Sequence, residues 1–149
     1  MKKTNKGFSM VELIIVIAIM AILAGAIAPA LIKYINKSRL STDVSNAQTI
    51  ASAITSALSD EDAFNDAPEL TQKPLSEVTG DKFKAQLTDA LPKWSEMQIK
   101  AKKDMNNTAF TSTNYLVSID PASSQVEVYI GDTAHMAYPN VVSTLIKKD

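Results

Sequence analysis

The feature that most constrains this chain is an uncharged run of 20 residues, 13–32, near its N-terminus. As an α-helix the run spans about 30 Å, the thickness of the hydrocarbon core of a bilayer. The rest of a 149-residue chain could hardly cover such a helix on all sides. We therefore predict that this segment enters a membrane rather than the core of a globular domain.

Two kinds of membrane segment fit the run. A removable secretory signal would be cut after the A-x-A stretch Ala24-Gly25-Ala26. Alternatively, the chain is cut between Gly7 and Phe8 and the run is retained. The second interpretation is favoured because removable signals have shorter apolar cores and carry no carboxylate at the start, whereas Glu12 stands at the start of this run.

The helical pattern also continues beyond the run. From Leu31 to Leu58, apolar residues recur mostly at three- and four-residue spacing, and the stretch contains neither Gly nor Pro. This pattern predicts one helix from Phe8 to about Ser59, about 75 Å long.

Several motifs in this order resemble the type IV pilins and the pseudopilins of type II secretion: a basic leader ending in Gly7, then Phe8, Glu12 five positions after Gly7, the uncharged run, and Pro29 within it. The resemblance covers about the first 50 residues. It implies a leader (1–7) removed by a prepilin peptidase, a transmembrane and polymerisation helix (8–32), an amphipathic continuation of that helix (33–59) and an exported α+β head (60–149).

The resemblance also implies that the peptidase N-methylates the new terminus, so that Phe8 becomes N-methylphenylalanine. Glu12 is then expected to pair with the Phe8 amine of an adjacent subunit during assembly. An unpaired carboxylate at bilayer depth is costly, and pairing relieves the cost only at the correct axial offset. Glu12 would therefore set the register between subunits, although a carboxylate resting among lipid head groups is the simpler alternative.

Gly25 and Pro29 bracket one helical turn. Proline at position 29 removes a backbone donor and clashes with the carbonyl of Gly25, which predicts a kink. The family resemblance implies further that this turn stretches or melts when subunits pack into a filament.

The head is predicted as α+β, with a small antiparallel sheet on the second half of the long helix. Residues 81–91 read as a short helix, and residues 96–102, 114–119 and 125–130 alternate as strands, the last two joined by a turn at 120–124. Residues 59–74 read as an irregular loop. Residues 140–148 fit either a strand or a short helix.

The sequence indicates no catalytic, metal or cofactor site. It contains no cysteine and one histidine, His135, which reads as a loop residue, while Trp94 reads as a packing residue. The acidic residues between positions 60 and 66 lack the spacing of a calcium loop and are expected to be solvated. A formal net charge of -1 argues against nucleic-acid binding by bulk charge.

These observations predict a structural subunit and not an enzyme. It would be a bacterial prepilin that spans the cell membrane once with its N-terminus in the cytoplasm and then joins a homo-oligomeric surface filament. Its expected partners are copies of itself, the peptidase-methylase, the inner-membrane assembly machinery and, before assembly, lipid. The alternatives are a secretion or competence pseudopilin and, more remotely, a membrane-anchored or secreted binding module.

Overall fold

The computed structural model describes residues 7–146. The first element is helix α1, Met10–Ala57, which is 48 residues long and contains Pro29. The predicted long helix is therefore confirmed, with ends that differ by two residues from the expected ones. The chain divides between Ile35 and Asn36 into two compact units, and residues 36–57 of α1 belong to the second unit.

In the second unit, one face of α1 is buried from Leu40 onward, as the apolar spacing predicted. Leu40, Ala47, Ile50, Ala51 and Ile54 are completely inaccessible to solvent. Full burial of a Leu or Ile side chain stabilises a fold by about 1.5–3 kcal/mol, so this stripe supplies much of the core. Asp43 lies in the same stripe and is also fully buried.

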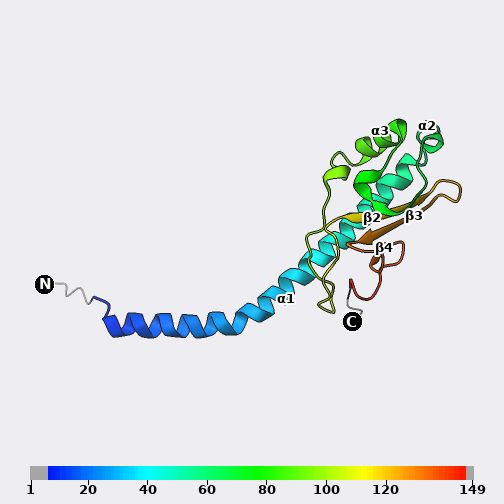
Figure 1. Ribbon diagram of the computed structural model, residues 1–149. Coiled ribbons are helices and arrows are strands. Elements are labelled where there is room, and N and C mark those ends of the chain that lie inside the picture. The colour runs from blue at the N-terminus through cyan, green and yellow to red at the C-terminus, as the bar shows by residue number, and fades with distance from the viewer. Residues whose placement is uncertain (1–6, 147–149) are drawn as a thin grey trace. The chain divides into compact units, whose positions relative to one another are not determined.

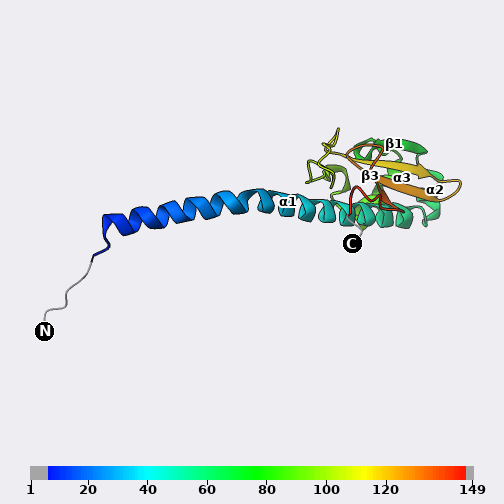
Figure 2. The ribbon, with the colours of Figure 1, turned by 90° about the horizontal axis from the view of Figure 1, so that it is seen from below.

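A four-stranded antiparallel sheet packs against this part of α1, as Figures 1 and 2 show. Each strand pairs with its neighbour in the sequence, in the order β1-β2-β3-β4. The strands are β1 (Leu70–Pro74), β2 (Tyr115–Asp120), β3 (Gln125–Ile130) and β4 (Met136–Tyr138). The predicted α+β class is confirmed.

The alternating residues of β2 and β3 form the inner face of the sheet. Tyr115, Val117 and Ile119 are fully buried, and they pair in register with Ile130, Val128 and Val126. Both strands were predicted from this alternation, and residues 121–124 form the expected turn between them.

The prediction of a strand at residues 96–102 is wrong. Glu96 is the last residue of a 3-10 turn (η2, Trp94–Glu96), and the remainder makes one isolated bridge, from Gln98 to Asn114. The reason is that the backbone N–H groups of Lys100 and Ala101 donate to the Asp43 carboxylate on α1 instead of to a neighbouring strand.

The expected irregular loop at residues 59–74 is also corrected. It contains helix α2 (Glu61–Asn65) and edge strand β1. Asp60 caps α2 by accepting a hydrogen bond from the Ala63 N–H at 2.9 Å, a contact typical of Asp at this position. Gln72 has a φ of 50° and the β1–β2 register shifts between Leu70 and Lys73, so this edge strand pairs irregularly with β2.

Helix α3, Asp81–Ala90, confirms the predicted helix, and its Phe83 and Leu87 are fully buried. Gly80 precedes it at φ 86°, where an added Cβ would lie 2.2 Å from the Asp66 carbonyl oxygen. A short 3-10 turn (η1, Leu75–Glu77) links β1 to this region. Residues 140–146, left open by the sequence, form neither helix nor strand, and residues 147–149 lie outside the described part of the chain.

Candidate functional site

The N-terminal end of α1 is held by two reciprocal hydrogen bonds. The Ser9 hydroxyl accepts from the Val11 N–H at 3.2 Å, and the Glu12 carboxylate accepts from the Ser9 N–H at 2.9 Å. Ser and Glu three residues apart form a capping box, which satisfies backbone donors that the first helical turn leaves unpaired. Ser9 is therefore the N-cap residue of α1, which begins at Met10.

Glu12 thus has a partner within its own chain, which the sequence reasoning missed. The S-x-x-E spacing of Ser9-Met10-Val11-Glu12 is the signal that could have found it. One backbone donor uses only part of what a carboxylate can accept, since its two oxygens offer about four lone-pair sites. The predicted pairing of Glu12 with an amine of a second copy stays a prediction.

Gly7 and Phe8 precede the helix and are exposed. The Phe8 side chain is 85% accessible, and a Cβ added at Gly7 would meet nothing within 4 Å. The fold of this chain therefore places no steric demand on Gly7. Residues 1–6 of the expected leader lie outside the described residues.

The first unit exposes an apolar surface along the part of α1 that follows Ser9. An 18-residue window of α1 with a mean hydropathy of 2.8 has none of its residues buried. Exposure of such a surface to water is strongly unfavourable, and contact with lipid or with other apolar helices would remove this cost. Its large members are Met10, Val11, Leu13, Ile14, Ile15, Val16, Ile17, Ile19, Met20, Ile22, Leu23, Ile27, Leu31, Ile32, Tyr34 and Ile35.

Gly25 and Pro29 lie within this surface and inside the helix. An added Cβ at Gly25 would meet nothing within 4 Å, so this side of the helix is open to a neighbour. The Gly25 carbonyl cannot receive the usual helical bond from residue 29, because proline has no N–H. The predicted kink and its melting on assembly stay predictions.

A buried polar network ties the head to α1. The Asp43 carboxylate, fully buried, accepts from the backbone N–H of Lys100 at 2.9 and 3.0 Å, from that of Ala101 at 2.7 Å and from the Tyr115 hydroxyl at 3.3 Å. Burial raises the pKa of Tyr115 well above its ordinary value, and the nearby Asp43 charge acts in the same direction. Asp43 was not singled out from the sequence.

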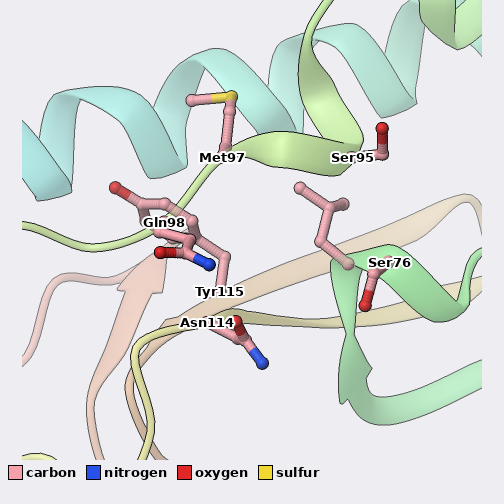
Figure 3. A pocket seen from close by; sticks show the side chains of 7 residues that line it. Ser76, Ser95, Met97, Gln98, Asn114 and Tyr115 are labelled. Carbon is pink, nitrogen blue, oxygen red and sulfur yellow. The ribbon is translucent and has the colours of Figure 1, made fainter.

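Figure 3 shows a small hollow beside this network, with Tyr115 reaching from β2 toward α1. Its volume is about 130 Å³, below the range of about 300–1,000 Å³ typical of small-molecule sites. The other labelled side chains are uncharged: Ser76, Ser95, Met97, Gln98 and Asn114.

His135 lies in the loop before β4, as expected, but it is buried to 7% exposure. Its Nδ1 contacts the Asp132 carboxylate, its Nε2 lies 3.5 Å from that of Asp104, and its ring packs edge-on against Phe110. These contacts join the β3–β4 loop to the segment between η2 and β2. Among residues 7–146, no group of three or more His, Cys, Asp or Glu side chains is placed to hold a metal ion.

Comparison with known proteins points to the N-terminal segment. A family model described as the prokaryotic N-terminal methylation motif matches residues 2–28. A fimbrial protein of Dichelobacter nodosus is 32% identical over 131 residues, which are 88% of this chain and 70% of that protein. A type IV major fimbrial protein, FimA, of the same organism is 32% identical over 103 residues, which are 69% of this chain and 64% of that protein. No solved structure matches.

Proposed function

Because this chain belongs to the type IV pilin family, we propose that it is a prepilin that is processed and then polymerised into a pilus-like filament. The observation that carries the proposal is the exposed apolar surface of α1, much of which lies within the methylation motif matched at residues 2–28. Membrane lipid covers this surface before assembly, and helices of other copies cover it afterwards. Both environments relieve the same cost of apolar exposure.

The proposed processing removes residues 1–7 and methylates the new amino group of Phe8. Gly7 and Phe8 are exposed and lie outside α1, so the bond between them can enter a protease site as an extended strand. Cutting there leaves the Ser9 N–H in place, so the capping box of α1 persists in the mature chain. The new amino group lies about 6 Å from Glu12 along a helix axis.

In the proposed filament, Glu12 accepts from the Phe8 amine of a neighbouring copy while it retains its bond to Ser9. A charge-assisted hydrogen bond of this kind is about twice as strong as a neutral one, and it matters most away from water. The carboxylate then favours the axial offset that brings a neighbouring amine to it. It disfavours offsets that leave it facing apolar side chains.

We further propose that residues 8–32 form the membrane and filament core, that residues 33–59 continue the helix, and that residues 60–149 form the exported surface. The N-terminus starts in the cytoplasm, where the peptidase-methylase and the inner-membrane assembly machinery act on it. The chain itself performs no catalysis in this scheme, in keeping with a family of structural subunits.

Both curated relatives are fimbrial proteins, which favours a surface pilus over a secretion or competence pseudopilus. The test combines peptide mass mapping with electron microscopy of fractions sheared from the cell surface. The proposal predicts long filaments whose subunit lacks residues 1–7 and carries one methyl group on Phe8. A soluble product beginning at Ile27 would contradict it and indicate ordinary secretion. Processed subunits confined to the cell envelope would indicate a pseudopilus.

A further inference from the structure

The second unit carries an open groove of about 600 Å³ between residues 99–102 and residues 110–113. The exposed side chains of Lys100 and Lys102 line it, together with three hydroxyl-bearing residues, 111–113. None of the described residues that line it is acidic. The groove therefore offers two cations and several hydrogen-bond donors to a negatively charged occupant.

More positive charge lies beside the groove. The Asn36 side chain donates to the Lys103 carbonyl at 3.0 Å, which places the adjoining turn of α1, with exposed Lys37 and Arg39, next to this loop. Within residues 7–146, the four cations Lys37, Arg39, Lys100 and Lys102 form no salt bridge. This end of the head therefore carries four cations that form no salt bridge with a described residue.

The opposite end of the head is acidic. Glu61 at the start of α2 and Glu69 just before β1 are exposed and form no salt bridge with any described residue. Figure 1 shows α2 at the far end of the head from the loop that carries the groove. The groove residue Ala101 donates its backbone N–H to Asp43 of α1, and α2 lies just after Ala57, the last residue of α1. At the helical rise per residue, Asp43 and Ala57 are separated by about 21 Å along α1.

We propose that the groove of one copy receives Glu61 and Glu69 of a second copy. The inference rests on the filament proposed above, in which copies lie parallel and are displaced along the axis. A displacement of about 21 Å brings α2 of one head to the groove of another. Because the two surfaces differ, the contact is head-to-tail and can propagate along a filament instead of closing a dimer.

This contact concerns a different neighbour from the one that meets Glu12. Pairing between Glu12 and a Phe8 amine requires an offset of about 6 Å, whereas the groove requires about 21 Å. The contact between the groove and Glu61 and Glu69, called the head contact below, is also solvent-accessible. Salt should therefore weaken it more than it weakens the pairing of Glu12 with the Phe8 amine inside the apolar core. Its main effect is to select the correct neighbour, as expected of complementary charge at an interface.

The chain contains no cysteine, which allows a direct test by cross-linking. Lys100→Cys and Glu61→Cys are combined in one full-length chain, and sheared filaments are treated with a short bifunctional maleimide. Within one copy the two sites are too far apart for the reagent, so each cross-link joins two copies. We expect a ladder of dimers, trimers and longer oligomers after denaturation. The single-cysteine variants can join only like to like and should give no ladder beyond a dimer.

Charge reversal provides a second measurement. Lys100→Glu with Lys102→Glu should lower the filament yield about tenfold, since like charges then meet across the contact. Adding Glu61→Lys and Glu69→Lys should restore the yield. A matched reversal of two exposed lysines outside the groove, Lys73→Glu with Lys93→Glu, should leave it unchanged.

The outcomes separate this inference from the proposed function. Wild-type chains that are never found in filaments would overturn both. Filaments that give no ladder and are insensitive to charge reversal would overturn the head contact alone. If the reversal leaves filaments intact but abolishes retention on immobilised heparin, the contact is overturned and the groove belongs to an external polyanion.

Discussion

Loss of the buried Asp43 carboxylate should strongly weaken the head, and Asp43→Ala makes this measurable. The substitution removes the acceptor of the Lys100 and Ala101 N–H groups and of the Tyr115 hydroxyl, around a site with no solvent exposure. Each buried donor left without a partner costs about 1–3 kcal/mol. The Ala101 and Tyr115 groups are buried, so we expect a loss of about 2–6 kcal/mol of unfolding free energy. That is a large part of a typical total of about 5–15 kcal/mol.

The assay is urea unfolding of the full-length chain in detergent, followed by the fluorescence of Trp94. Trp94 is the only tryptophan and is buried to 6% exposure, so its emission reports on the head. Asp89→Ala, an exposed acidic residue of α3, is the matched control and should change the unfolding free energy by less than about 0.5 kcal/mol.

A double-mutant cycle shows whether the loss comes from the network. In a Tyr115→Phe background, Asp43→Ala should cost about 1 kcal/mol less, because one of the donors is already absent. If Asp43→Ala destabilises the head no more than Asp89→Ala does, the buried carboxylate does not anchor residues 100–101 to α1.

Two further predictions concern the head and the leader. Burial raises the pKa of Tyr115 in the folded state, so the folded chain holds a proton that the unfolded chain releases above about pH 10. The stability that this group contributes is complete below about pH 10 and falls as the pH rises further, by up to about 1.4 kcal/mol per pH unit. In urea titrations between pH 8 and 11, Tyr115→Phe should therefore show a smaller decrease of the unfolding free energy with pH than the wild type. Replacing Gly7 by tryptophan should prevent removal of the leader, which immunoblots detect as an unprocessed chain. Helix α1 should still form, because a Cβ at position 7 would meet nothing within 4 Å. Complete maturation of that variant would contradict the proposed cleavage site.

Local patterns were sufficient to predict the parts of the fold that follow one simple period. The long helix, α3, β2 and β3 each carry an uninterrupted helical or alternating pattern, and the structure contains all four. The same rule failed at residues 96–102, where Ile99 and Ala101 are buried as the alternation predicts but no strand forms. Alternation determines which side chains face inward, whereas the partner of the backbone depends on Asp43, distant in sequence.

The remaining elements lacked a readable signal. Strand β1 is interrupted by a positive φ at Gln72 and ends in Pro74, and β4 is only three residues long. Such strands depend on the neighbouring strand for their conformation more than on their own sequence. Asp43 was detectable in principle, because a charged residue three positions after Leu40 and four before Ala47 must lie in the buried stripe.

At the N-terminal site, the sequence identified Gly7, Phe8 and Glu12 but supplied only one role for the carboxylate. The structure adds a second, because Glu12 completes the cap of α1 with Ser9. Glutamine can fill that capping position as well as glutamate, whereas only glutamate carries a charge. The two roles of Glu12 can therefore be separated by one substitution.

The most direct test of the assembly mechanism is the filament yield of Glu12→Gln in sheared cell-surface fractions, compared with Ser9→Ala. Glu12→Gln retains an acceptor for the Ser9 N–H but cannot form an ion pair, whereas Ser9→Ala weakens the cap by about 0.5–2 kcal/mol and leaves the charge in place. We expect Glu12→Gln to be processed and inserted in the membrane but nearly absent from filaments, with Ser9→Ala close to wild type. Normal filaments from Glu12→Gln would show that the carboxylate serves only to start the helix.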